Sequence, residues 1–533
     1  MHDLVIRGGQ VLDGSGAPAR EADLAVGDGR IVAVEPGLSG PARRIIDARD
    51  RVVAPGFIDI KTHSDWTLPL IPRAESKIRQ GVTTEVIGHC GFTVAPALPG
   101  RVELLRDYLA PSAPWYPFRA TTFAEYLDTF PATSVNVVPL VGHNTLRLMT
   151  VGMEKRAPRA DEMDLMRQLL EEALDAGALG LSSGLFTAPG SWAEPEELVA
   201  LGQLLRGRDA LYATHVRDES RGIFGAVREA IDTAEACGVR LQIVHVKVSG
   251  TESWGSAARL LAEIEAARAR GIDVHCDQYP YTAASNPLRN LLPLWVQEGG
   301  VDAMLQRLAQ PAARARIRAD IDADGLPSWG RIPSWDAVRI AISPHRGEYA
   351  GQTIAELARR GACDPIDAVC DYLIADRGAT RILITSISED DVREFLRSPL
   401  VFAGSDGFAC APYGVTSQGK PHPRYYGTFP RILGHYVREL GVLPLAEAVR
   451  KMTGAPAGAL RLVDRGVLRE GAWADVTIFD PATVIDRATY DDPHRYPDGV
   501  SHVIVNGEVV IDDGEHTGAL PGRVLRRGRR GVA

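Results

Sequence analysis

The first 55 residues alternate apolar and polar positions between glycine-containing turns. This period-two pattern is typical of β-strands joined by hairpins, and it runs through DLVIRGGQVLDG, ADLAVGDGRIVAVEPG and RRIIDARDRVVAPG. The same pattern returns near the other end of the chain, in GVLREGAWADVTIFDP and GVSHVIVNGEVVIDDGE. Two strand-rich ends share a sheet only if a further domain is inserted between them. We therefore predict a small β-sandwich domain formed by residues 1–55 and 466–520.

The middle of the chain, residues 56–465, alternates short apolar segments with amphipathic helical segments. Helical periodicity is clearest in DEMDLMRQLLEEALDAG and WGSAARLLAEIEAARARG. The strand candidates are GVTTEVIGHCG, SVNVVPLVGH, GALGLSSGLF, ALYATHV, VRLQIVHVKVSG, DVHCDQYPY, TRILITS and VFAGSDG. Strand–helix alternation over about eight units predicts an α/β fold, a (β/α)₈ TIM-like barrel. Functional residues of such a barrel lie at the C-terminal ends of its strands.

Composition narrows the class of protein. The net charge of -9 disfavours nucleic acid as a partner. No apolar run reaches the roughly 20 residues of a membrane helix, and MHDLVIRGGQVLDGSG lacks the features of a signal peptide. We therefore expect a cytoplasmic protein without a membrane partner, and a homo-oligomer remains possible.

The six cysteines and the basic C-terminus add two further expectations. The cysteines are scattered without a CxxC pair, so a disulfide scaffold is not expected. The basic residues 521–533 end in RVLRRGRRGVA with no aromatic residue among them. We expect a solvated tail there rather than a nucleic-acid-binding arm.

Five strand-like segments end in a residue that binds metals or ionises: His63, Cys90, His215, His245 and Asp406. A lone histidine or buried cysteine at such a place is usually structural. Together, however, a thiolate and imidazoles form the ligand set that zinc prefers, and a catalytic zinc keeps one position for water. Three strands would supply Cys90, His215 and His245 as ligands. Asp406 is either a turn residue between small neighbours or a carboxylate that takes a proton from the activated water.

A second group of residues is cationic. Lys247 lies two positions beyond His245 and therefore on the same face of a strand. With Arg424 in GKPHPRYYGTFP and Tyr281 in DVHCDQYPY, it would suit a substrate carboxylate. Taken alone, each cation is more simply a surface residue.

The N-terminal GGQVLDGSG…VVAPGFIDIKTHSD resembles the opening of the amidohydrolase superfamily. More specific blocks resemble its D-aminoacylase (N-acyl-D-amino-acid deacylase) branch: GVTTEVIGHCGFTVAP, GALGLSSGLF, YATHVRDES, IVHVKVSG, DQYPYTAAS, FAGSDG and HPRYYGTFPRILGHYVRE. The resemblance covers nearly the whole chain. It is weakest over residues 97–135 and 290–395, which are expected to be insertions or lids.

The resemblance implies a barrel with a small β-sandwich and zinc-dependent hydrolysis of N-acyl-D-amino acids to a carboxylic acid and a free D-amino acid. It implies a tight zinc site of Cys90, His215 and His245. It also implies that Asp406 is the catalytic base and that Lys247, Tyr281 and Arg424 contact the substrate carboxylate. Ser285 is a looser match to the family's substrate-carboxylate contacts.

The sequence departs from the superfamily at DIKTHSD, where Lys61 stands in place of the first histidine of His-x-His. In the superfamily this pair binds a second, weaker metal ion. A protonated lysine has no lone pair for a metal, so we expect one tightly bound zinc ion, with the Lys61 ammonium partly replacing the second charge. Carbamylation of Lys61 is an alternative. His63 either ligates weakly or donates a hydrogen bond to the developing oxyanion.

Two other functions compete with this interpretation. A cyclic-amide hydrolase of the hydantoinase or dihydroorotase kind commonly carries a carbamylated lysine after a mid-barrel strand, and GALGLSSGLF offers none. A non-catalytic scaffold is supported only by Lys61. Side-chain and acyl preference stay open, and residues 186–192 with the insertion at 290–395 are expected to decide them.

Overall fold

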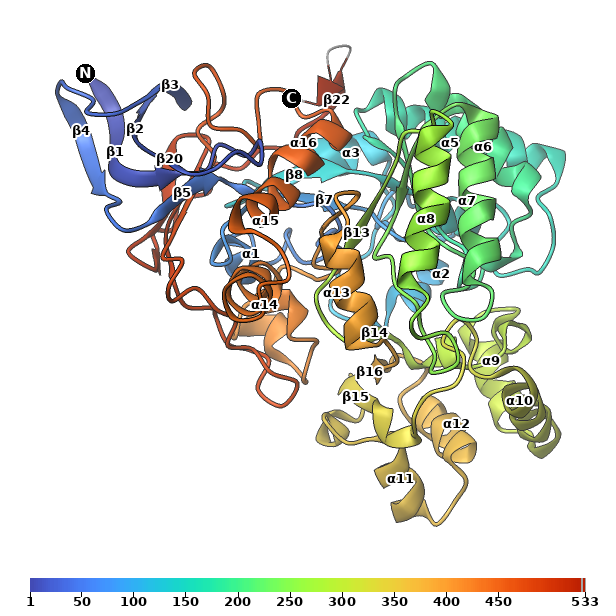
Figure 1. Ribbon diagram of the computed structural model, residues 1–533. Helices are drawn as coiled ribbons and strands as arrows, with labels where there is room; N and C mark the ends of the chain where they lie inside the picture. The colour runs from blue at the N-terminus through green and yellow to red at the C-terminus, as the bar shows by residue number, and fades with distance from the viewer. Residues whose placement is uncertain (529–530, 533) are drawn as a thin grey trace.

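A ring of short parallel strands forms the centre of the computed structural model, which describes residues 1–528 and 531–532 (Figure 1). The strands of the ring are β6 (Phe57–Asp59), β7 (Val82–Ile87), β8 (Asn136–Pro139), β9 (Val141–Gly142), β10 (Gly180–Gly184), β11 (Leu211–His215), β12 (Arg240–Ile243), β13 (Val274–Gln278) and β17 (Val401–Ala403). The short strands β8 and β9 follow one another, with β8 pairing β7 and β9 pairing β10. They therefore share one place in an eight-membered ring.

The ring closes between its first and last strands, just beyond their C-terminal ends. Thr62 and Gly407 form a parallel bridge. The amide of Asp406 donates to the carbonyl of Lys61 (2.9 Å), and the amide of His63 donates to the carbonyl of Gly407 (3.0 Å). The fold is the predicted (β/α)₈ barrel, and its seam fixes Lys61, His63 and Asp406 beside one another.

Helices cover the outside of the ring because each presents one apolar face to it. Helix α5 (Ala160–Asp175) buries Met166, Leu170 and Leu174 in the main core cluster. In Figure 1, α5 stands beside α6 (Pro195–Arg206), α7 (Ile223–Cys237) and α8 (Ala257–Ala269). The other helical segments around the barrel are α1 (Glu75–Ile78), α2 (Val102–Leu109), α3 (Phe123–Asp128), α4 (His143–Thr150), α13 (Glu389–Arg397), α14 (Arg424–Arg431), the π-helix Ile432–Glu439, α15 (Leu445–Met452) and α16 (Gly454–Leu460).

The two ends of the chain form one connected nine-stranded sheet. Its strands are β1 (His2–Val11), β2 (Arg20–Gly27), β3 (Arg30–Glu35), β4 (Ala42–Asp47), β5 (Val52–Pro55), β18 (Val476–Phe479), β19 (Val500–Val505), β20 (Glu508–Asp512) and β21 (Glu515–His516). The link between the ends is the antiparallel pair β5–β18, in which Val53 faces Ile478. These two residues share a core cluster with Leu24 and Ile504, so neither end buries its apolar face without the other.

A subdomain separates β13 from the last barrel helix and strand. Its antiparallel sheet has the order β14 (Ala283–Pro287), β16 (Arg381–Thr385) and β15 (Val338–Ile342). Helices α9 (Val301–Leu308), α10 (Pro311–Asp324), α11 (Ile354–Gly361) and α12 (Pro365–Ala375) complete it at the lower side of Figure 1. TRILITS therefore belongs to this sheet and not to the barrel, which corrects the sequence-based assignment. Apolar content marks a buried strand but does not say which sheet buries it.

The C-terminal segment is not a solvated tail, so this expectation was wrong. Leu525 and Val532 are each 1% exposed, and Val532 pairs with Leu462. Arg527 donates hydrogen bonds to the carbonyls of residues 174, 178 and 208. The apolar residues between the arginines hold the segment against the barrel. Within the described residues, no helix combines the length and the apolar character needed to cross a bilayer.

Candidate metal centre and active site

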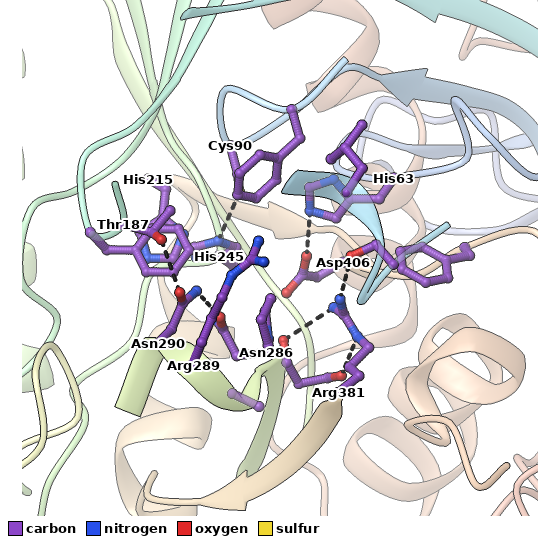
Figure 2. Close-up of a pocket in the computed structure, with 18 of the residues that line it drawn as sticks. His63, Cys90, Thr187, His215, His245, Asn286, Arg289, Asn290, Arg381 and Asp406 are labelled. Atoms are coloured by element: carbon purple, nitrogen blue, oxygen red, sulfur yellow. Dashed lines mark hydrogen bonds and ion pairs between the residues drawn. The ribbon is translucent and has the colours of Figure 1, made fainter. Parts of the chain in front are cut away.

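Three of the predicted residues meet in one cluster at the C-terminal end of the barrel. Cys90 follows β7, His215 ends β11 and His245 follows β12. One potential ligand atom from each lies within 4.8 Å of the other two, and all three side chains are buried. Sγ of Cys90 lies 3.4 Å from Nε2 of His245 (Figure 2). The barrel thus brings together ligands that are separated by up to 155 positions along the chain.

The chain bends sharply at these positions. Cys90, His245 and Asp406 all adopt positive φ angles, of 55°, 37° and 51°, a region that is unfavourable for residues with a side chain. Such strain collects at functional sites and persists only where the surroundings hold it. One such support is Gly184 in β10, where an added Cβ would lie 2.1 Å from the carbonyl oxygen of Cys90. A larger residue there would displace Cys90.

The chemistry of these three side chains fits a zinc ion. Both ring nitrogens of His215 are buried without a hydrogen-bond partner in the described chain, so a free lone pair is available for a metal. Burial and the charge of Lys247 hold the pKa values of His215 and His245 well below their usual range, so both rings are neutral. Burial raises the pKa of the Cys90 thiol to about 12. A dication binding there would displace the thiol proton.

Glu219 contacts two of the three candidate metal ligands, and it was not predicted from the sequence. Its Oε1 lies 3.2 Å from Nδ1 of His245, 3.3 Å from Nε2 of His215 and 2.5 Å from Nζ of Lys247. Nδ1 of His245 faces both Glu219 and Nζ of Lys247 (2.9 Å), so the ring is oriented with its Nε2 toward Cys90. Glu219 lies in a loop four residues beyond His215, where strand periodicity gives no signal.

Asp277 fixes the backbone of the same ligand. Its Oδ1 accepts a hydrogen bond from the amide of His245 (2.8 Å), and its Oδ2 accepts one from Gln242 (2.7 Å). Asp277 belongs to β13, beside β12. It therefore ties the sharp bend at His245 to the neighbouring strand.

Asp406 lies at the centre of a cationic environment. Lys61 donates to its Oδ1, Nη2 of Arg424 lies 2.7 Å from its Oδ2, and Nε2 of His63 lies 3.3 Å from its Oδ1. Burial alone would raise the pKa of Asp406, but the charges of Arg424 and Lys61 outweigh it and hold that pKa well below its usual range. Burial and the charge of Lys61 lower the pKa of His63 to about 3. At neutral pH the carboxylate is therefore ionised and the imidazole is neutral.

Only some of the residues that were predicted to bind the substrate carboxylate line the cavity. Lys247 and Ser285 line the cavity, whereas Arg424 lies behind Asp406 and is committed to it. Tyr281 does not line this cavity, but Tyr279 does. The chain turns between them, since the amide of Tyr281 donates to the carbonyl of Tyr279 (3.0 Å). Strand β13 ends at Gln278, before both tyrosines.

The outer walls of the cavity come from the loop after β10 and from the inserted subdomain. The ring of Phe186 stacks on His215, with centroids 3.7 Å apart. The subdomain contributes Ser285, Asn286, Arg289 and Arg381, so its wall is largely polar. As expected, both the 186–192 segment and the insertion reach the site.

Comparison with known proteins places the chain in a family. Residues 44–511 match the model of the amidohydrolase family. The chain is 37% identical to an N-acyl-D-glutamate deacylase of Alcaligenes xylosoxydans xylosoxydans over 98% of its own length and 96% of that protein.

Two solved structures share the fold over nearly their whole length. One is an N-acyl-D-glutamate deacylase from Bordetella bronchiseptica, complexed with zinc and a phosphonate mimic of the tetrahedral intermediate (35% identity, TM-score 0.80, covering 98% of this chain and 99% of that one). The other is a D-aminoacylase with a binuclear metal centre, described as showing one-metal activation and second-metal attenuation (35% identity, TM-score 0.83, covering 99% and 100%). The chain belongs to the amidohydrolase family.

Proposed function

We propose that this protein hydrolyses the amide bond of N-acyl-D-amino acids in a zinc-dependent reaction, releasing a carboxylic acid and a free D-amino acid. The observation that carries the proposal is the meeting of Cys90, His215 and His245 in the cavity that also exposes Asp406. The zinc-bound deacylase of known structure and the deacylases of similar sequence support this substrate class.

Cys90, His215 and His245 would hold the zinc ion. A zinc ion in such a site polarises a carbonyl group and makes water a stronger acid. The ligand set leaves one position of a tetrahedral site for water or substrate. Glu219 and Asp277 keep His245 in the orientation that this role requires.

Asp406 is the group that moves the proton. As an ionised carboxylate it accepts a proton at Oδ from the attacking water, and it then passes the proton to the nitrogen of the departing amine. Arg424 and Lys61 lower the pKa of Asp406, so its protonated carboxyl group releases the proton readily. They also fix its orientation from both sides.

Lys61 takes the position of a second cation. Its Nζ lies 2.8 Å from Nε2 of His63 and contacts Asp406, and its side chain is fully buried. An ammonium there repels a second divalent ion and already supplies a positive charge beside Asp406. We therefore propose a single-zinc enzyme, in contrast to the binuclear centre of the related D-aminoacylase.

The cyclic-amide alternative finds no support in the cavity. Strand β10 has the sequence GLSSG and provides no lysine for a carbamate bridge.

A substrate panel tests the proposal. Purified protein with quantified zinc should deacylate N-acetyl and N-formyl D-amino acids, and the matched L-enantiomers and hydantoins serve as controls. Removal of zinc by a chelator should abolish turnover, and one equivalent of zinc should restore it. Equal activity on hydantoin or dihydroorotate, or full activity without metal, would contradict the proposal.

A further inference from the structure

Cys90 lies in a tight turn, residues 88–91, directly after β7. The backbone φ angles of Gly88, Cys90 and Gly91 are 85°, 55° and 77°, so most of the turn is left-handed. Strand β7 ends at Ile87, and its ladder therefore does not hold these residues. A strained backbone of this kind keeps its shape only where the surroundings fix it.

The hydroxyl group of Ser182 in β10 closes this turn. Ser182 Oγ accepts a hydrogen bond from the amide of Gly91 (3.1 Å) and donates one to the carbonyl of Gly88. The two bonds join the backbone on either side of Cys90. Because Ser182 is fully buried, bulk water does not compete for these backbone groups.

Two further residues hold the turn by hydrogen bonds, but each reaches only one end of it. Oδ2 of Asp65 accepts a hydrogen bond from the amide of Gly88 (3.1 Å). The amide of Thr145 donates one to the carbonyl of Gly91 (3.1 Å). Only Ser182 spans both ends among these three residues, and its loss would leave a buried carbonyl and a buried amide without this partner, which is costly.

Ser182 and its neighbour Ser183 have different surroundings because side chains alternate along β10. Ser182 points to the same side as Gly184, the residue that leaves room for the carbonyl of Cys90. The hydroxyl of Ser183 points to the other side and lies 2.9 Å from the hydroxyl of Tyr212. One of two adjacent serines thus serves the Cys90 turn.

We infer that Ser182 is a positioning residue of the metal centre, which fixes the turn so that the thiolate of Cys90 is directed at the two histidines. The inference rests on the zinc site of the proposed function. Sγ of Cys90 lies 3.4 Å from Nε2 of His245 (Figure 2). His215 and His245 come from other strands and are contacted by Glu219, at 3.3 and 3.2 Å. Removal of the hydroxyl therefore loosens the thiolate ligand and spares the imidazoles.

Cobalt substitution reads the thiolate ligand directly. Co²⁺ accepts the same imidazole and thiolate ligands as zinc, and a bound thiolate gives a sulfur-to-cobalt charge-transfer band in the near ultraviolet. We expect this band in the unmodified protein and a marked loss of it in Ser182→Ala, while the visible bands of imidazole-bound Co²⁺ remain. Zinc affinity, measured by competition with a chromophoric chelator, should fall about 10- to 100-fold.

The chain offers a matched control one position away. Ser183→Ala removes the same hydroxyl group from the other side of β10 and should keep both the band and the affinity. Ser182→Thr and Ser182→Val form a second pair, with side chains of nearly equal size that differ in the hydroxyl group. The threonine variant should keep more of the band and of the zinc affinity than the valine variant. This difference holds even if the added methyl group disturbs the packing of both, and circular dichroism checks that each variant is folded.

The outcomes separate this inference from the proposed function. An unchanged band and zinc affinity in Ser182→Ala, or equal losses in Ser183→Ala, would overturn the role of Ser182 while the zinc site stands. An unmodified protein without the band would refute the thiolate ligand and the inference together. If the band is lost only in the Ser182 variants but no N-acyl-D-amino acid is cleaved, the deacylase proposal fails and the role of Ser182 stands.

Discussion

The ammonium nitrogen of Lys61 lies 2.8 Å from Nε2 of His63, and both side chains face Asp406. The pair stands where the barrel seam joins the ends of β6 and β17. Lys61 contacts both the neutral histidine and Oδ1 of Asp406, so its positive charge already occupies the space beside this carboxylate oxygen.

Lys61→His should therefore create a second metal site. The added imidazole restores the His-x-His pair and removes the repelling charge, so bound zinc should rise from one toward two equivalents per chain. Elemental analysis after dialysis at fixed free zinc measures this. The exposed Lys155→His serves as the control and should leave the stoichiometry at one. Two tightly bound zinc ions in the unmodified protein would refute the single-metal proposal.

Asp406→Asn should keep zinc but lose turnover. The amide is close in size to the carboxylate but does not accept a proton, and general-base catalysis by such a group contributes roughly 10²- to 10⁴-fold. Steady-state kinetics with zinc quantified in the same sample measures the effect. Undiminished kcat in a zinc-loaded variant would show that another group is the base.

Glu219→Gln should weaken zinc binding although Glu219 is not in the predicted ligand set. The variant leaves Lys247 without its partner and alters the group behind Nδ1 of His245. Changes of this kind cost about 10- to 100-fold in metal affinity. Competition with a chromophoric chelator gives the affinity, and Glu229→Gln, which alters a carboxylate paired with Arg217, is the matched control. An unchanged zinc affinity would remove Glu219 from this role.

Gly184→Ala should disturb the site through the backbone. The added methyl group would clash with the carbonyl of Cys90, and a shift of about 1 Å in a catalytic group costs on the order of 100-fold in rate. We expect a loss of this size in kcat/KM together with weaker zinc binding. Gly225→Ala in α7, where an added Cβ meets nothing within 4 Å, should retain full activity. Equal behaviour of the two variants would contradict the argument.

Because Lys451 is buried, we expect the free energy of unfolding to depend on pH, independently of catalysis. Burial lowers its pKa from 10.5 to about 7, and its Nζ donates to the carbonyl of Leu396. Because the folded pKa is below the unfolded one, the destabilisation is fully present below pH 7 and disappears as the pH rises to about 10.5.

Lys451→Met should therefore raise the free energy of unfolding near pH 7 by about 2–4 kcal/mol, and the gain should shrink toward pH 10. Thermal melts across this pH range measure the change, with the exposed Lys155→Met as the control. A gain that does not depend on pH would show that packing, and not charge, is responsible.

Much of the site was predictable because each strand has a local apolar pattern, and the barrel geometry places the residue at the end of that strand in the site. His63, Cys90, His215, His245 and Asp406 all follow apolar strands, and parallel strands bring their C-terminal ends to one edge. The sheet of the two chain ends was predictable for a similar reason, since the period-two pattern is local.

The remaining residues of the site depend on contacts that no local pattern reports. Glu219 reaches His245 from a loop, and Tyr279 replaces Tyr281 because the chain turns at the end of β13. Arg289 and Arg381 enter the cavity from a subdomain whose docking is set by tertiary packing. In the sequence they are indistinguishable from surface arginines.

The pairing of β5 with β18 has a consequence for synthesis on the ribosome. Strand β5 ends at Pro55, whereas β18 begins at Val476, so its partner emerges only after some 420 further residues. At about 5–20 residues per second this interval lasts roughly 20–80 s. During that time the edge of β5 is open to other chains, and a nascent polypeptide with such an edge is a natural client for chaperones.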